Sequence, residues 1–430
     1  MVKNFLTEPV FCDTEIEALF DSVTLARAML RVEGALARAQ ADMGMFPLET
    51  AQAITQTAET LTIAPEVLAA GVTKNGVPVP TLVKDLRAAV GDPHADWVHW
   101  GATSQDIIDN ALSLCYRAAL KVLGARLRDL LETLERQSTA HSKTIMAART
   151  RNQLATPTTF GLRIAQWAQP LIACETEFEQ VRTRALRVQF GGASGNQTAV
   201  APHGPDISDR LANELQLTPG IPWHTDRSGL QGLAAWLVAV TTALGKIATD
   251  VAILSRSEIA EAFGGTEGGS STMPHKSNPV TAEALLSLAR FAIACNLGLA
   301  SAGIHTEERD GANWTVEWKL LPELLVTCGS ALSLCLTLTK NLSANRETMV
   351  HRIENAPEMM AETAMFALSK RQGRQRASKI VAEAISQSEP LSVALRKLEP
   401  SIDWAGVFDF GKVIASSRRL QRDIFSHRNT

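Results

Sequence analysis

One long stretch without charged side chains limits the folds that this chain can adopt. Residues 229–245 carry no formal charge, and they continue directly into the amphipathic segment KIATDVAILSRSEIAEA at 246–262. The uncharged run is shorter than the ~20 residues that a helix needs to cross a bilayer, and Gln231 interrupts it. A helix of about 35 residues that is apolar on all sides is typical of the centre of a large bundle. We therefore predict a buried bundle helix over 229–262 rather than a membrane span.

The composition favours helices throughout the chain. Alanine, the best helix former, makes up roughly one residue in seven, whereas aromatic residues account for only 5% of the sequence. With 430 residues, of which 45% are hydrophobic, the chain is long enough to bury a large core. The predicted fold class is all-α.

Charge and cysteine usage restrict the partners and the compartment. The net charge of −3 argues against a nucleic-acid partner, because phosphate binding needs an excess of Lys and Arg. The first twenty residues contain acidic side chains and lack the basic and apolar regions of a signal peptide. The six cysteines are scattered without a CxxC motif, which predicts buried free thiols. We expect a cytoplasmic protein that binds neither nucleic acid nor membranes.

Helical periodicity and its breaks predict three parts of the chain. Apolar residues recur at three- and four-residue spacing over 22–44 and 106–141, and longer apolar segments follow at 280–301 and 320–342. After Asn345, prolines and glycines shorten the helical segments. The predicted domains are an N-terminal helical domain at 1–100, a central long-helix domain at 101–345 and a small C-terminal helical domain at 346–430.

The sequence contains no recognisable motif for a metal or a nucleotide cofactor. Nine histidines are spread along the chain without an HExxH pattern, and no GxxxxGK[ST] loop is present. The glycine clusters at 191–195 and 264–269 lack the strand–turn–helix context of a phosphate-binding loop. We expect no cofactor.

The segment GGTEGGSSTMPHKSNP at 264–279 is rich in glycine and serine and also carries polar groups that can bind a ligand. A glycine- and serine-rich run fits a simple connector, and Pro274 and Pro279 stiffen its far side. However, the run also carries a lysine, Lys276, and an amide, Asn278, beside two hydroxyls. These groups favour a segment that binds a carboxylate or an enolate.

Five segments of the chain resemble the fumarase/aspartase superfamily, which includes class II fumarase and the argininosuccinate and adenylosuccinate lyases. The eleven residues GSSTMPHKSNP at 269–279 are similar to its signature. Its other regions occur in the expected order, as HWGATSQD at 99–106, the segment 149–161, QFGGASGN at 189–196 and EERDGANWTVEW at 307–318. The resemblance covers roughly the whole chain. It implies three helical domains, a twenty-helix core in a homotetramer, and active sites that each take segments from three subunits.

The resemblance also implies a reaction and a set of residues. Family members catalyse β-elimination beside a carboxylate, or its reverse, through an aci-carboxylate. The catalytic base falls on Ser270, a weak base that needs activation, and Lys276 is implied to stabilise the developing charge. The further positions implied to bind substrate are His99, Thr103, Ser104, Gln153, Ser271, Asn278 and Arg309.

One position departs from the family pattern. Where the lyases read RTH-x-Q, with a histidine that helps to protonate the leaving group, this chain has Arg151. An arginine cannot donate protons at neutral pH, but a guanidinium holds an anion through charge-assisted hydrogen bonds. A carboxylate, with a pKa near ~4, leaves as a stable anion and needs no acid. Either Arg151 acts on such a group as a catalytic residue, or it forms an ion pair on the surface.

In the superfamily that the chain resembles, the member whose leaving group is a carboxylate is the muconate cycloisomerase. The resemblance and Arg151 together therefore predict a cycloisomerase of aromatic catabolism that closes a 3-substituted cis,cis-muconate to its muconolactone. Its partner is a small polyanion, either the 3-carboxy- or the 3-sulfo-substituted substrate. An adenylosuccinate-type lyase is the nearest rival, disfavoured by Arg151 and by the bulk of Trp314. A family scaffold reused as a structural protein is a further alternative.

Overall fold

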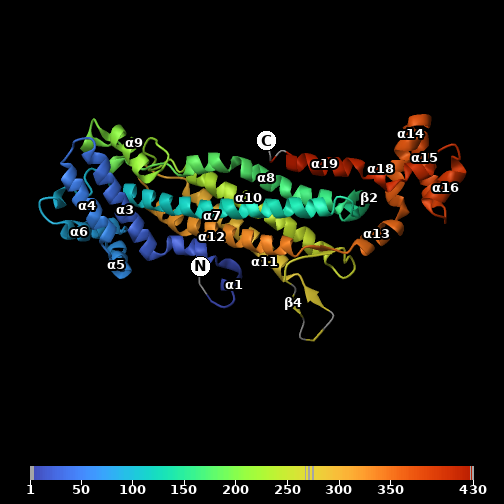
Figure 1. Ribbon diagram of the computed structural model, residues 1–430, viewed down its shortest axis with the longest axis horizontal. Helices are drawn as coiled ribbons and strands as arrows, with labels where there is room; N and C mark the ends of the chain where they lie inside the picture. The colour runs from blue at the N-terminus through green and yellow to red at the C-terminus, as the bar shows by residue number, and fades with distance from the viewer. Residues whose placement is uncertain (1–3, 267, 270–271, 274–275, 427, 429–430) are drawn as a thin grey trace. The chain divides into compact units, whose positions relative to one another are not determined.

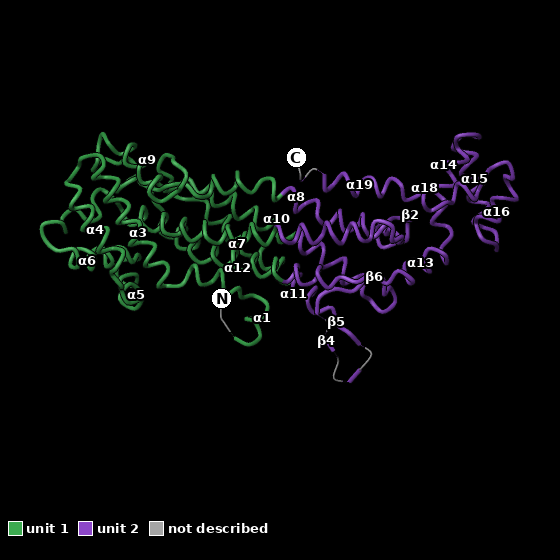
Figure 2. Tube along the Cα trace, in the orientation of Figure 1, with its two compact units in different colours: residues 1–127, 174–242, 287–333 green, residues 128–173, 243–286, 334–430 purple. Residues whose placement is uncertain are grey.

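The computed structural model describes residues 4–266, 268–269, 272–273, 276–426 and 428. Contacts divide the chain into two units (Figure 2). Unit 1 comprises residues 1–127, 174–242 and 287–333, and unit 2 comprises residues 128–173, 243–286 and 334–430. Because long helices contribute to both units, this division does not test the three-domain prediction, which stays a prediction.

The described part of the chain is mostly helical, as predicted (Figure 1). The N-terminal helices are α1 Glu8–Phe11, α2 Thr14–Glu17, α3 Ser22–Ala41, α4 Leu48–Thr60, α5 Pro65–Asn75 and α6 Val79–Val90. The long helices are α7 Ser104–Ala140, α8 Phe160–Ala185, α10 Ser228–Leu254, α11 Val280–Ala302 and α12 Gly311–Lys340, and the shorter α9 is Gly204–Leu215. The C-terminal helices are α13 Arg346–Glu354, α14 Ala361–Gln372, α15 Arg374–Ser386, α16 Leu391–Leu398, α17 Trp404–Val407, α18 Phe410–Val413 and α19 Ala415–Ser426. Short 3₁₀ turns connect them at Ala18–Phe20, Ala95–Trp97, Gly192–Ser194, Thr198–Val200 and Pro357–Met360.

Local capping chemistry explains several of these boundaries. The Asp21 side chain accepts a hydrogen bond of 2.7 Å from the Thr24 N–H at the start of α3, and this bond lowers the pKa of Asp21. Helix α5 begins at Pro65 and ends before Gly76, which adopts the left-handed conformation with φ of 74°. The predicted helices at 22–44 and 106–141 correspond to α3 and α7 and are confirmed.

Helix α10 contains the uncharged run, and about half of its most apolar window is buried. Leu233, Leu237 and Val240 have no exposed surface, and the Trp236 N–H donates to the carbonyl of Cys174 in α8. By length and composition, α10, α11 and α12 are each apolar enough to cross a membrane, with 56%, 33% and 61% of their most apolar windows buried. All six cysteines are free thiols, and five of them are buried.

The predicted extension of this helix to Ala262 is wrong, because α10 ends at Leu254. The chain turns after Ser255, and the Glu261 N–H donates to the carbonyl of Leu254. Strand β3, Ala262–Phe263, then pairs with β6, Ser343–Ala344. The turn brings the buried Glu261 carboxylate into ion pairs with Arg149 and Arg352. The stabilisation from these ion pairs outweighs the local helix propensity.

A β-hairpin in unit 2 was not expected from the helical pattern. Strands β1, Ile145–Thr150, and β2, Gln153–Thr159, pair antiparallel and leave Arg151 and Asn152 as a two-residue turn. Both turn residues have positive φ, 51° and 65°, as a hairpin turn of this length requires. The hairpin therefore presents Arg151 at its tip.

Candidate active site

Asp106, in the first turn of α7, binds two glycine-containing loops in unit 1. The first loop precedes α7 and contains Gly101, and the second loop contains Gly191 and Gly192. The two carboxylate oxygens of Asp106 accept hydrogen bonds from the backbone N–H groups of Gly191, Gly192 and Thr103, at 2.8, 2.9 and 3.0 Å. The His224 Nε2 lies 2.9 Å from the same carboxylate. Asp106 is 1% exposed, so these bonds form away from water and hold the two loops together.

Asn110, one turn further along α7, fixes the second loop. Its amide donates to the carbonyl of Gln189 at 2.6 Å and accepts from the N–H of the same residue at 2.9 Å. Gly192 has φ of 68°, and a Cβ atom there would lie 3.0 Å from the carbonyl of Gly101. A side chain at position 192 would therefore be strained by the left-handed backbone and crowded against the carbonyl of Gly101, so glycine suits this close approach.

Unit 1 brings together four of the predicted substrate-binding residues. Thr103 donates its N–H to Asp106, and Ser104 begins α7. Arg309 donates to the carbonyls of Gly192 and Ala193, at 3.2 and 2.9 Å, so its guanidinium lies against the second loop. His99 belongs to the first loop, where the Asp106 charge acts on its ring. The guanidinium of Arg309 and the hydroxyl groups of Thr103 and Ser104 are groups that can bind an anion.

Unit 2 contains the other described site residues, beginning with the hairpin. Arg151 lies in the turn at its tip, Gln153 begins β2 directly after the turn, and both residues are exposed. Arg149, near the end of β1, binds the buried Glu261 through two hydrogen bonds of 2.8 and 2.6 Å. Arg352 of α13 forms an ion pair with the same carboxylate. The hairpin is thus anchored by a buried carboxylate while Arg151 remains available to a ligand.

Asn278 lies on a short ribbon formed by β4, Gly268–Gly269, and β5, Ser277–Asn278, and Lys276 directly precedes β5. Lys276 is exposed and Asn278 is half-buried. Ser270 and Ser271, the predicted base and its neighbour, lie outside the described residues. Their assignment stays a prediction.

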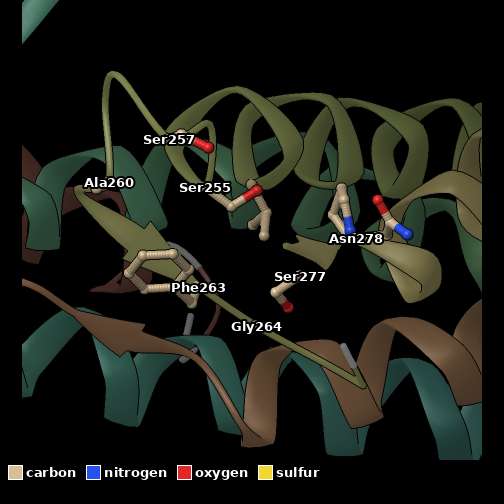
Figure 3. Close-up of a pocket in the computed structure, with 9 residues that line it drawn as sticks. Ser255, Ser257, Ala260, Phe263, Gly264, Ser277 and Asn278 are labelled. Carbon is tan, nitrogen blue, oxygen red and sulfur yellow. The ribbon is translucent and has the colours of Figure 1, made fainter. Parts of the chain in front are cut away.

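A cleft of about 270 Å³ adjoins this ribbon (Figure 3). Its lining includes the amide of Asn278 and the hydroxyl groups of Ser255 and Ser277. Phe263 and Ala260 form apolar parts of its wall. Among the described residues that line it, Asn278 is the predicted site residue.

A buried charge network that was not predicted from the sequence lies next to Asp106. The Arg227 guanidinium lies between the carboxylates of Asp109 and Glu317, at 2.8 and 2.5 Å, and all three side chains are at most 5% exposed. Burial alone raises the pKa of Asp109, but Arg227 outweighs burial and lowers it. The signal in the sequence is the pair Asp106 and Asp109 with Asn110, which places polar groups on one face of an otherwise apolar helical segment.

Trp314 belongs to this network rather than to the lining of a site. Its N–H donates to Asp109 at 2.9 Å, and its ring packs against Trp318 at 4.5 Å between centroids. The side chain is 3% exposed. The bulk of Trp314 was expected to disfavour an adenylosuccinate-type lyase. Because the side chain is buried in this network, its bulk does not argue against that activity.

Comparisons with known proteins agree with these motifs. The family model described as Lyase matches residues 12–293. The 3-carboxy-cis,cis-muconate cycloisomerase of Bradyrhizobium diazoefficiens is 34% identical over 91% of this chain and 89% of its own length, and the nitrosuccinate lyase of Streptomyces davaonensis is 34% identical over 93% and 87%. The crystal structure of the 3-carboxy-cis,cis-muconate lactonizing enzyme from Pseudomonas putida superposes with a TM-score of 0.90 over 99% of both chains, at 29% identity. The chain therefore belongs to the lyase family that forms the fumarase/aspartase superfamily.

Proposed function

We propose that this enzyme is a cycloisomerase that closes 3-carboxy-cis,cis-muconate to its muconolactone, in the catabolism of aromatic compounds. The observation that carries this proposal is the position of Arg151 at the tip of an anchored hairpin. At the matching position the lyases have a histidine that helps to protonate the leaving group. The names of the relatives in Bradyrhizobium and Pseudomonas support the same substrate.

The reaction joins two parts of one molecule. One carboxylate oxygen of the substrate adds to the diene to form a C–O bond, and a proton is added to the neighbouring carbon, which lies α to another carboxylate. Substrate and product are isomers in their fully protonated forms. At neutral pH the substrate trianion takes up one proton, which comes from water through the acid–base group, and becomes the lactone dianion, so the balance requires no oxidant and no second substrate. In reverse, a base removes the α-proton and the ring carboxylate leaves as a stable anion.

Each candidate residue has a role in this scheme. Ser270 delivers the proton to carbon, while Lys276 and Asn278 bind the carboxylate on which negative charge accumulates. Arg151 holds the carboxylate that attacks the diene. The remaining negative charge of the substrate is bound by Arg309 and the residues beside it.

Arg151→His is expected to raise the KM for 3-carboxymuconate roughly ten- to hundredfold and to change kcat less, since a charge-assisted hydrogen bond contributes about 1.5–3 kcal/mol. Steady-state kinetics that follow the loss of diene absorbance measure both constants. Arg182→His is the matched control, because Arg182 forms an ion pair on the surface with Glu179. Unchanged KM and kcat in Arg151→His would mean that Arg151 is only a surface residue.

The proposed function is tested by supplying the purified protein with 3-carboxymuconate, 3-sulfomuconate and adenylosuccinate in parallel. Lactone formation from the first substrate, with its stereochemistry determined by NMR, is the expected result. Preference for 3-sulfomuconate would assign the sulfonated substrate, which Arg and Lys accept equally well. Release of fumarate from adenylosuccinate without lactone formation would overturn the proposal.

A second candidate is the elimination of nitrite from nitrosuccinate. The observation that favours it is again Arg151, because nitrite also leaves as a stable anion and needs no proton donor. A relative with this name is 34% identical to the chain. Nitrite release, measured in the same set of assays, distinguishes it from lactonisation.

The proposal also includes assembly as a cytoplasmic homotetramer in which each active site takes segments from three subunits. Helix α11 supports it, because Ile293 and Leu297 are 44% and 69% exposed on a helix that is otherwise apolar enough to be buried. Light scattering on the purified protein measures the number of copies.

A further inference from the structure

His99 is held in an unusual backbone conformation by three long side chains of unit 1. Its φ is 64°, in the left-handed region that few residues other than glycine adopt. On one side, Arg87 of α6 donates to the carbonyl of Val98 at 3.0 Å, and on the other, Gln40 of α3 donates to the carbonyl of Trp100 at 2.7 Å. Residues kept in such conformations cluster at functional sites, where the surroundings determine their geometry.

The third side chain, Glu33 of α3, binds the imidazole itself. Its Oε1 lies 2.7 Å from His99 Nδ1, and its side chain has no exposed surface. The other carboxylate oxygen, Oε2, is buried and forms no hydrogen bond with any residue that the structure describes. A buried carboxylate is costly unless it is compensated, so this one requires a proton on Nδ1 of His99.

This contact decides which ring nitrogen is available. Because Nδ1 donates to Glu33, Nε2 is the atom that His99 presents to a ligand, and the ring is 17% exposed. Among the described residues, no hydrogen bond to Nε2 is formed. Asp106, in the first turn of α7, binds the backbone of Gly192, and Arg309 donates to the carbonyl of the same residue.

The charged groups around the ring favour the imidazolium. Burial alone lowers the pKa of His99, and Arg87 also lowers it, but the charges of Glu33 and Asp106 outweigh both and raise the pKa. Removal of the Glu33 charge therefore lowers the pKa of His99, so that the imidazolium is lost at a lower pH than in the wild type.

We propose that Glu33 is a positioning residue that holds His99 with Nδ1 protonated, so that the Nε2–H of the imidazolium binds one carboxylate of the substrate. The inference rests on the proposed function for the identity of that substrate. It adds to the predicted contact at His99 a buried partner from α3 and a pH dependence of substrate binding.

Glu33→Gln tests the role of the charge, because glutamine keeps the shape and still accepts a hydrogen bond from Nδ1. At pH 7.5 we expect the KM for 3-carboxymuconate to rise roughly tenfold while kcat stays within about threefold, since a charge-assisted bond to the substrate is lost. In both proteins KM increases with pH as the imidazolium of His99 loses its proton. In Glu33→Gln this increase occurs at lower pH than in the wild type, so acidification returns KM to a near-normal value. Glu49→Gln is the matched control, because exposed Glu49 lies 3.9 Å from the ring of another histidine, His94.

A double-mutant cycle separates positioning from a merely structural effect. In the His99→Gln background, Glu33→Gln is expected to cause no further rise of KM, because the group through which Glu33 acts is gone. Additive effects of the two changes would overturn the inference. So would a KM–pH profile of Glu33→Gln that coincides with that of the wild type.

Two measurements keep the inference separate from the proposed function. NMR titration of the His99 ring reports its pKa without turnover, and calorimetry measures the affinity of propane-1,2,3-tricarboxylate between pH 5.5 and 8.5. If the wild type does not convert muconate, the proposed function fails, but a Glu33-dependent shift in both measurements still supports the positioning role. If neither measurement shifts in Glu33→Gln, the positioning role is wrong whatever the substrate is.

Discussion

Replacement of Ser270 by alanine is expected to lower kcat for lactonisation at least a hundredfold and to leave KM nearly unchanged. A positioned acid–base group contributes about 10²–10⁴ to the rate, and alanine removes the one oxygen that carries the proton. The loss appears in kcat because the proton moves only in the transition state, whereas Lys276 and Asn278 still bind the substrate. Stopped-flow or steady-state loss of diene absorbance measures it.

The matched control for this experiment is Ser386→Ala in α15, where the hydroxyl donates to the carbonyl of Glu383 three residues earlier. That variant is expected to retain wild-type kinetics. If Ser270→Ala stays within about threefold of the wild type, Ser270 is not the proton donor. The assignment of the acid–base role from the family signature would then be wrong.

Arg227→Met is expected to lower the free energy of unfolding by about 3–5 kcal/mol, because it leaves two buried carboxylates without their cation. Asp109 and Glu317 are 1% and 5% exposed, and Arg227 binds both. Methionine fills most of the volume but supplies no positive charge. Urea denaturation, with the midpoint and slope compared between variants, measures the loss.

The pH dependence provides a check of the cause. In the wild type, the low pKa of Asp109 stabilises the fold above the unfolded value near ~3.9, and this stabilisation is lost as the pH falls. In Arg227→Met burial favours the protonated form of Asp109, so acidification restores part of the stability and narrows the difference from the wild type. A constant difference between pH 4.5 and 8 would contradict this explanation.

Arg182→Met provides the comparison with an exposed ion pair. Arg182 and Glu179 lie one turn apart on α8 with side chains 42% and 69% exposed, and such pairs contribute about 0–1 kcal/mol. A loss in Arg227→Met as small as that in Arg182→Met would show that the buried network adds nothing to stability.

Patterns local to the chain were predictable from the sequence. The spacing of apolar residues predicted α3 and α7, and the uncharged run at 229–245 predicted the buried part of α10, because side chains three and four residues apart share one face of a helix. The order of short polar motifs predicted the family, since those motifs are recognisable without any knowledge of their contacts.

The tertiary structure decided which of these polar groups meet. Asp106 binds Gly191 and Gly192, some 85 residues further along the chain, and Glu261 binds Arg149, 112 residues away, which ends α10 at Leu254. Glu33, one buried acid in an apolar helix, acquires a role only through His99, 66 residues later. Burial makes each of these pairs decisive, because an uncompensated charge away from water costs more than local helix propensity supplies. No periodicity in the sequence records which distant partner compensates it.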